Sequence, residues 1–130
     1  MRAVPGLVLV LVLALGLAAC GGSSSSGGGG GGGGGSQSAV SKSPCPSGAV
    51  VIHMRNIQFD PKTASAKVGD KVCWQNDDDV QHDAQADDGA FKSALFGKGE
   101  TFTTTVTKAG DISYVCTVHP NMTATLKVKP

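Results

Sequence analysis

The segment DISYVCTVHPNMTATLKV, residues 111–128, contains two runs in which polar and apolar residues alternate. Alternation with a period of two is the pattern of a half-buried β-strand, so we expect strands over 111–116 and 122–128. Pro120 and Asn121 lie between the two runs and favour a turn there. The stretch therefore predicts two consecutive strands joined by a short loop.

The same loop carries three side chains with soft or borderline metal-binding atoms, Cys116, His119 and Met122. A thiolate, an imidazole and a thioether in the spacing C-x2-H-x2-M suit copper, which binds the first two strongly and the thioether weakly. A fourth ligand must come from another part of the chain, and His82 in the segment NDDDVQHDA (76–84) is the candidate. The pattern therefore predicts a copper site where two loops meet.

Two other chemistries fit these residues less well. Nucleophilic catalysis by Cys116 would use His119 as the base, but no glycine-rich oxyanion-binding turn accompanies the cysteine, and Met122 would have no role. Structural zinc prefers four Cys or His ligands arranged in pairs. We therefore expect a metal-binding protein that is not an enzyme.

Residues 44–130 are expected to form one all-β sandwich domain. Short runs rich in Val, Thr, Ile and aromatic residues are separated by Gly, Pro and Asp about every ten residues, and helix signals are nearly absent. Further strands are expected over 49–59, 71–76 and 100–106, whereas the pattern between 76 and 99 is rich in loops.

This expected domain is close to electrically neutral. The chain has eleven Lys and Arg residues, of which all but Arg2 and Lys42 lie in 44–130, so nine basic residues there meet ten Asp and Glu residues. A nucleic-acid-binding domain would be clearly basic. The balance of charge therefore argues against nucleic acid as a partner.

The N-terminal part of the chain has the composition of a targeting segment. A charged start at Arg2 and an apolar run over 3–19 form a secretory signal pattern, which is short for a membrane span and lacks a basic flank after it. The run ends in LAAC, which resembles the lipobox of bacterial lipoproteins, so we expect residues 1–19 to be a lipoprotein signal peptide and Cys20 to be lipidated. Simple secretion, with Cys20 removed or left as a thiol, is the alternative.

Residues 20–43 are expected to be a lipid-anchored cysteine followed by a flexible Gly/Ser-rich linker. Nine consecutive glycines bury no apolar area to offset their backbone entropy. The expected location is the extracytoplasmic face of a bacterial membrane, in the periplasm or at the cell surface. There the linker would hold a monomeric domain close to the membrane.

Several of these segments together resemble a known family. F-x-P at 59–61, GDKVCWQNDD at 69–78, a loop histidine and Y-x-C-x2-H-x2-M at 114–122 are similar to the plastocyanin-like blue copper proteins, the cupredoxins. The short ligand loop is similar to that of amicyanin. The resemblance extends over about 50–128 and implies a Greek-key β-sandwich with one type 1 copper ion. It implies four copper ligands: His82, Cys116, His119 and Met122.

The resemblance also suggests roles for residues around the site. Asn76 matches a family position that braces the ligand loops. Asp83 departs from the neutral residue that the family usually has after the histidine, and we expect its carboxylate to accept a hydrogen bond from Thr117. Among the remaining side chains, we expect Trp74, Tyr114 and Met54 in the core and His53 on the surface.

With Cys20 assigned to lipid and Cys116 to copper, Cys45 and Cys73 remain. Two spare thiols outside the cytoplasm rarely stay reduced. The alternation of the strand points Cys73 away from the core, where a segment carrying Cys45 can lie over it. We therefore expect a Cys45–Cys73 disulfide, on the cysteine count and not on the family.

Two functional classes follow from a single copper site. An electron carrier would pass one electron through the Cu(II)/Cu(I) couple, with the edge of His119 as the exit port. The alternative is a copper-binding protein for buffering or delivery of copper without an electron-transfer partner. A multicopper enzyme is excluded because Val115 and Thr117, and not histidines, flank Cys116.

Six acidic residues fall within twelve positions around the loop histidine. One interpretation is that they are turn formers on a solvated loop. The other is a negative rim around the copper end that steers a basic redox partner, such as a cytochrome or an oxidase, into a short-lived complex. The six residues are Asp77, Asp78, Asp79, Asp83, Asp87 and Asp88.

Overall fold

The computed structural model describes residues 39–130, so the expectations for the signal peptide, for Cys20 and for most of the linker lie outside the described residues. Residues 39–130 form strands and loops without a helix, and thus contain no helix with the length and hydropathy needed to cross a membrane. The strands are β1 (Val40–Ser41), β2 (Val50–Arg55), β3 (Gln58–Asp60), β4 (Thr63–Lys67), β5 (Lys71–Asn76), β6 (Gln85–Ala86), β7 (Thr101–Thr105), β8 (Gly110–Val115) and β9 (Thr123–Lys129).

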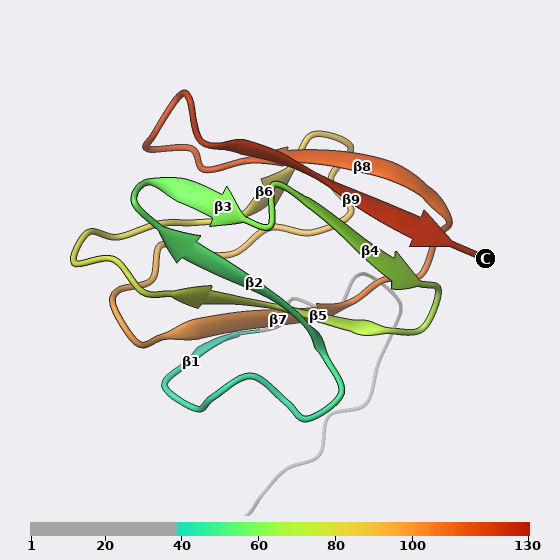
Figure 1. Ribbon diagram of the computed structural model, residues 1–130, viewed down its shortest axis with the longest axis horizontal. Helices are drawn as coiled ribbons and strands as arrows, with labels where there is room; N and C mark the ends of the chain where they lie inside the picture. Colours follow the sequence, from blue (N-terminus) through green and yellow to red (C-terminus); the bar gives the residue numbers. More distant parts are fainter. Residues whose placement is uncertain (1–38) are drawn as a thin grey trace, which may run out of the picture. The chain divides into compact units, whose positions relative to one another are not determined.

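The strands form two sheets that lie face to face (Figure 1). One sheet has the order β1-β7-β5-β2-β3, and the other has the order β4-β9-β8-β6. Each sheet contains one parallel pair, β2 with β5 and β4 with β9, among antiparallel ones. The expected all-β sandwich is confirmed, and the parallel pairs show that the chain crosses between the sheets.

Alternate residues of the facing strands build the core between the sheets. Met54, Trp74 and Tyr114 are completely buried, as expected from the sequence. The Trp74 ring lies 4.7 Å from the ring of Phe91 and 5.5 Å from that of Phe102, measured between centroids. It meets the Tyr114 ring edge-on at 5.7 Å. This aromatic cluster supports the end of β8, from which the predicted ligand loop begins.

The single strand expected over 49–59 is wrong, because the chain forms a hairpin there. Arg55, at the end of β2, pairs with Gln58, at the start of β3. Asn56 and Ile57 form the two-residue turn, with φ angles of 55° and 56°. Positive φ at both positions is the type I′ pattern, in which Asn-Gly is the usual sequence and a β-branched residue is rare. Ile57 therefore conceals the turn in the sequence.

The folded domain extends further toward the N-terminus than Pro44, the first residue of the domain expected from the sequence. Val40 and Ser41 form β1 and pair with the edge of β7. Val40 also packs against the core. The Thr101 hydroxyl donates a hydrogen bond of 2.8 Å to the carbonyl of Ser43. The last residues of the segment expected to be linker thus belong to the sheet.

A disulfide joins Cys45 to Cys73 on the outer side of the larger sheet. Cys73 lies in β5 between Val72 and Trp74, whose side chains belong to the core, so the Cys73 side chain points to the opposite face. It is nevertheless completely buried. The disulfide fastens the segment before β2 onto this face of the sheet.

Several loops gather at one end of the sandwich, on the left in Figure 1. They are the β2–β3 turn, the loop that follows β5 and the β8–β9 loop. Backbone bonds connect this end: Asp77 donates to the carbonyl of Met54, and Gly99 donates to that of Asn76. The predicted copper ligands all lie in two of these loops.

Candidate metal centre

Among residues 39–130, His82, Cys116 and His119 form a group with the geometry of a metal site, with donor atoms all within 4.8 Å of one another. The two Nδ1 atoms are 3.1 Å apart. The Cys116 Sγ lies 3.7 Å from Nδ1 of His82 and 3.4 Å from Nδ1 of His119. Atoms bound to one first-row metal ion at about 2.0–2.3 Å lie roughly 3–4 Å apart, so this triangle fits a single ion.

The β8–β9 loop is closed by hydrogen bonds among the three predicted ligands that it carries. Cys116 donates its amide to the carbonyl of Met122 at 2.9 Å, and Met122 donates to that of His119 at 2.9 Å. Met122 is buried in the same core cluster as Cys116, whereas His119 is half-buried. The fold thus brings the four predicted ligands to the same end of the sandwich, where Met122 is part of the apolar core.

Asn76 holds the loop of His82 in place. Its Nδ2 donates to the carbonyls of Val80 at 2.8 Å and Phe96 at 2.9 Å. Its Oδ1 accepts from the amide of Asp78 at 2.8 Å. His82 and Phe96 also exchange two backbone hydrogen bonds. Because Asn76 is completely buried, these bonds act without competition from water, in line with the bracing role expected for it.

Asp83 connects the two ligand loops. One carboxylate oxygen accepts from the amide of Thr117 at 2.6 Å, and the other accepts from its hydroxyl at 2.6 Å. The expected hydrogen bond to Thr117 is confirmed and is doubled. Since Asp83 follows His82 and Thr117 follows Cys116, this pair sets the separation of a nitrogen and a sulfur donor.

The whole domain matches a family of known proteins. A family model described as copper binding proteins, plastocyanin/azurin family, matches residues 47–129. The chain belongs to this family. Copper is therefore its cofactor, and the His82, Cys116 and His119 cluster of this cupredoxin fits a type 1 copper site.

Individual relatives agree with this assignment. The chain is 30% identical over 80 residues to amicyanin from Paracoccus denitrificans, over 58% of this chain and 61% of that protein. It is 27% identical over 88 residues to amicyanin from Paracoccus versutus, over 64% of this chain and 67% of that protein. The match thus spans about three fifths of the first relative's length.

Solved amicyanin structures share the fold. An oxidised amicyanin variant has a TM-score of 0.66 and 25% identity, over 72% of this chain and 95% of that one. The Cu(I) form of another amicyanin variant has a TM-score of 0.65 and 27% identity, over 72% of this chain and 94% of that one. The similarity therefore covers nearly the whole of each amicyanin domain.

The environment of Cys116 in this cupredoxin favours the neutral thiol while no metal is bound. Burial raises the pKa of the Cys116 thiol above its ordinary value. The backbone amides of Asp83 and Val118 offset this only in part, and the Asp83 carboxylate raises the pKa further. Because copper binds the thiolate, metal uptake releases a proton here.

Asp78, one of the six acidic residues around the loop histidine, contacts a predicted ligand directly. Its Oδ2 lies 2.8 Å from Nε2 of His82 and accepts from the amide of Ile57 at 2.9 Å. Its Oδ1 accepts from the amide of Asn56 at 2.7 Å. Burial acts to raise the pKa of Asp78, but the hydrogen bonds outweigh it and hold the pKa below its usual value. The signal in the sequence that could have indicated this contact is an acidic residue four positions before a predicted ligand histidine.

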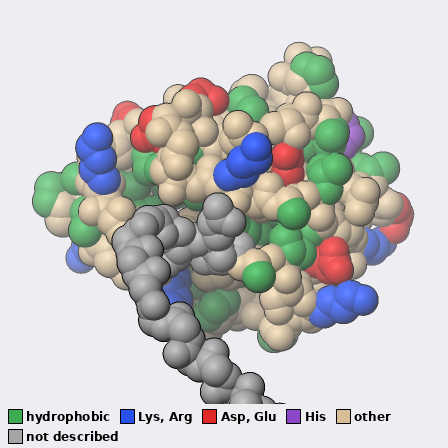
Figure 2. Space-filling model, turned by 180° about the vertical axis from the view of Figure 1, so that it is seen from behind, with side chains coloured by type: hydrophobic (Ala, Val, Ile, Leu, Met, Phe, Trp, Pro, Cys, Tyr) green, Lys and Arg blue, Asp and Glu red, His purple; other side chains and the backbone are tan. Residues whose placement is uncertain are grey.

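The six acidic residues do not form one rim of free carboxylates around the ligands. Asp77 accepts hydrogen bonds from His53 and Gln75, so its carboxylate is not free. His53, expected on the surface, is half-buried and bonded to Asp77. Asp87 donates its amide to the carbonyl of Ser113, which lies within β8 and not in the ligand loop. On the face shown in Figure 2, acidic side chains lie near basic ones, among hydrophobic and neutral side chains.

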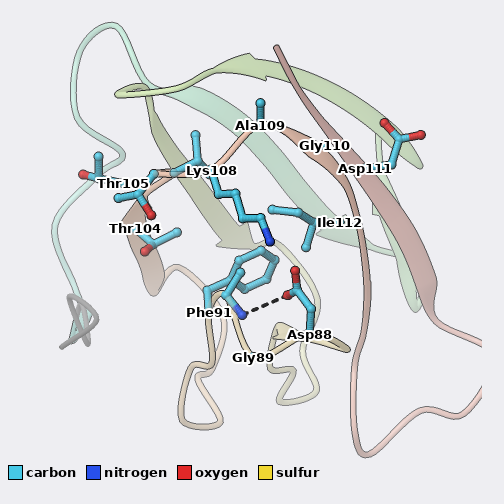
Figure 3. A pocket seen from close by; sticks show the side chains of 13 residues that line it. Asp88, Gly89, Phe91, Thr104, Thr105, Lys108, Ala109, Gly110, Asp111 and Ile112 are labelled. Carbon is cyan, nitrogen blue, oxygen red and sulfur yellow. Dashed lines mark hydrogen bonds between the residues drawn. The ribbon is translucent and has the colours of Figure 1, made fainter. Parts of the chain in front are cut away.

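A separate surface hollow lies at the β7–β8 turn, with a volume of about 430 Å³. Residues 88–91 and 104–112 line it. Figure 3 shows the Lys108 side chain reaching over the hollow toward Phe91, and Asp88 accepting a hydrogen bond from the amide of Ala90. None of the predicted copper ligands lines this hollow, so it is separate from the metal centre.

Proposed function

We propose that this protein is an electron carrier in which His82, Cys116, His119 and Met122 hold a single type 1 copper ion. Bound copper supplies the Cu(II)/Cu(I) couple. The observation that carries the proposal is the triangle of donor atoms, 3.1–3.7 Å apart. The hydrogen bonds between Asp83 and Thr117 join the two loops that carry these atoms. A site held in one geometry reorganises little when the charge of its ion changes, which favours rapid electron exchange.

The surroundings of His119 support its role as the port for electrons. His82 is completely buried, whereas His119 is half-buried and therefore reaches the surface. Val80 and Val118 lie in the two ligand loops, and Leu95 directly precedes Phe96, which pairs with His82. All three side chains are 44–47% exposed. Exposed apolar side chains beside a redox centre suit a short-lived contact with another redox protein.

Copper buffering or delivery is the competing function, and the methionines argue against it. Residues 39–130 contain two of them, Met54 and Met122, and both are completely or almost completely buried. A protein that hands copper to a partner needs accessible soft ligands. The described domain offers no exposed methionine for this exchange.

The two functions predict different electrochemistry for the copper-loaded protein. We expect an intense blue absorption band and fast, reversible one-electron voltammetry, with copper retained when a chelator is added between scans. We expect this because the bonds by which Asn76 and Asp83 hold the ligand loops do not involve the metal ion. Slow, irreversible voltammetry with rapid transfer of copper to the chelator would instead support buffering or delivery.

We further propose an extracytoplasmic location with a redox protein as partner. The Cys45–Cys73 disulfide supports this location, since disulfides persist in oxidising compartments. The lipid anchor at Cys20 stays a prediction from the sequence. The monomeric state likewise stays a prediction.

A basic partner would be attracted by the acidic side chains that remain exposed at the copper end. Asp79 is 88% exposed and pairs with the exposed Lys98, so its removal should leave the blue band unchanged. Asp79→Asn should weaken the salt dependence of electron transfer to a cationic redox protein, because exposed charges act on association rates and are screened over about 8–10 Å. Stopped-flow rates at several ionic strengths measure this effect.

The chain offers a matched control for this experiment. Asp111 also forms an exposed pair with a lysine, Lys127, but lies at the start of β8, at the opposite end from the ligand loop. Asp111→Asn changes the net charge equally. If both variants alter the salt dependence to the same extent, the partner does not recognise the copper end by its charge.

A further inference from the structure

The Asp78 carboxylate connects two loops through three contacts. It binds both amides of the β2–β3 turn, those of Asn56 and Ile57, at 2.7 and 2.9 Å. Its Oδ2 also lies 2.8 Å from Nε2 of His82. The carboxylate is 17% exposed, and the imidazole is completely buried. This contact is therefore poorly screened by water.

The contact determines which ring nitrogen of His82 carries the hydrogen and which has a free lone pair for a metal. A carboxylate accepts hydrogen bonds, so the Nε2 atom that faces it carries the hydrogen. The other ring nitrogen, Nδ1, then has a free lone pair, and it faces Sγ of Cys116 and Nδ1 of His119. Hydrogen bonding at the far nitrogen of a ligand histidine fixes its tautomer and orientation.

The turn on the other side of Asp78 has an unusual backbone. Ile57 has a φ of 56°, a conformation that β-branched residues rarely adopt, and its side chain is 48% exposed. The turn thus gains little from burying this side chain. Both of its amides point at the Asp78 carboxylate, which holds the turn against the loop of His82.

We propose that Asp78 is a positioning residue that directs Nδ1 of His82 toward the copper and lowers the reduction potential of the site. A buried negative charge hydrogen-bonded to a ligand stabilises Cu(II) more than Cu(I), because Cu(II) carries one more positive charge. This inference rests on the proposed ligand set. It differs from the roles of Asn76 and Asp83, whose hydrogen bonds hold the loops and do not touch an imidazole.

Asp78→Asn should keep the blue band, because Cys116 is unchanged, and should raise the reduction potential. We expect the affinity for Cu(II) to fall about 10–100-fold, as is typical when a hydrogen-bond partner of a metal ligand is lost. A tenfold loss for Cu(II) alone corresponds to a rise of ~59 mV for one electron. Asp79→Asn, which removes the neighbouring exposed carboxylate, should shift neither quantity to this extent.

A second substitution separates the effect on the histidine from the effect on the turn. Glycine adopts positive φ without strain, so Ile57→Gly should stabilise the turn that Asp78→Asn weakens. The double variant should recover thermal stability while keeping the raised potential. If the potential returns to the wild-type value, Asp78 acts only through the turn and the proposal is overturned.

The tautomer of His82 provides a test that needs no metal. In 15N-labelled protein without metal, long-range 1H–15N spectra should show the hydrogen of His82 on Nε2, and Asp78→Asn should lose this preference. A variant that keeps both the tautomer and the potential of the wild type would overturn the proposal. Failure of the wild-type protein to turn blue with Cu(II) would refute the copper function instead, and the tautomer would still decide the role of Asp78.

Discussion

Replacing Cys116 by serine should abolish the blue band and most of the affinity for copper. The band requires a copper–thiolate bond, and Cys116 is the free cysteine among residues 39–130. Serine is a much harder ligand that stays protonated at neutral pH, so the loss of affinity should exceed the ~10–100-fold that follows the loss of an outer hydrogen-bond partner. The visible spectrum and a copper titration against a competing chelator measure both effects.

The fold of this variant should be preserved. Serine has nearly the size of cysteine, and the backbone bond from residue 116 to the carbonyl of Met122 does not involve the side chain. The circular dichroism and the melting temperature of the metal-free protein are therefore the control. A Cys116→Ser variant that turned blue would show that the thiolate comes from another residue.

Removing the disulfide with alanine at both Cys45 and Cys73 should lower the free energy of unfolding by about 3–4 kcal/mol. The cross-link joins residues 28 positions apart, and the loop-closure entropy that it removes from the unfolded chain accounts for this amount. For a domain of this size, the melting temperature should fall by about 12 °C or more. Thermal and denaturant unfolding, followed by circular dichroism, provide the measurement.

The copper site should be unaffected by this change while the variant remains folded. The disulfide lies on the outer face of β5, and none of the predicted ligands lies in the segment it fastens. The blue band and the potential at low temperature should therefore match the wild type, and chemical reduction of the wild-type disulfide should reproduce the lower melting temperature. A loss below about 1 kcal/mol would contradict this account, because the cross-link would then remove little entropy from the unfolded chain.

Features that depend on consecutive residues are predictable from the sequence alone. The strands on either side of the ligand loop follow from alternation with a period of two, which each segment carries locally. The ligand set of the loop follows from the softness of its donor atoms at a short, fixed spacing. The Asp83–Thr117 bond was predictable because each residue directly follows a predicted ligand, so bringing the ligands together also brings this pair together.

Features that join residues distant in the chain depend on how the strands pair and are not predictable from local patterns. The β2–β3 hairpin was missed because Ile57 occupies a position where glycine would have revealed the turn. Asp78 contacts this turn across 21 and 22 residues, because the parallel pairing of β2 with β5 places the ends of both strands side by side. The sequence does not distinguish the six acidic residues from one another. A carboxylate accepts hydrogen bonds from the donors that the fold brings within about 3 Å, so the partner of each depends on the tertiary structure.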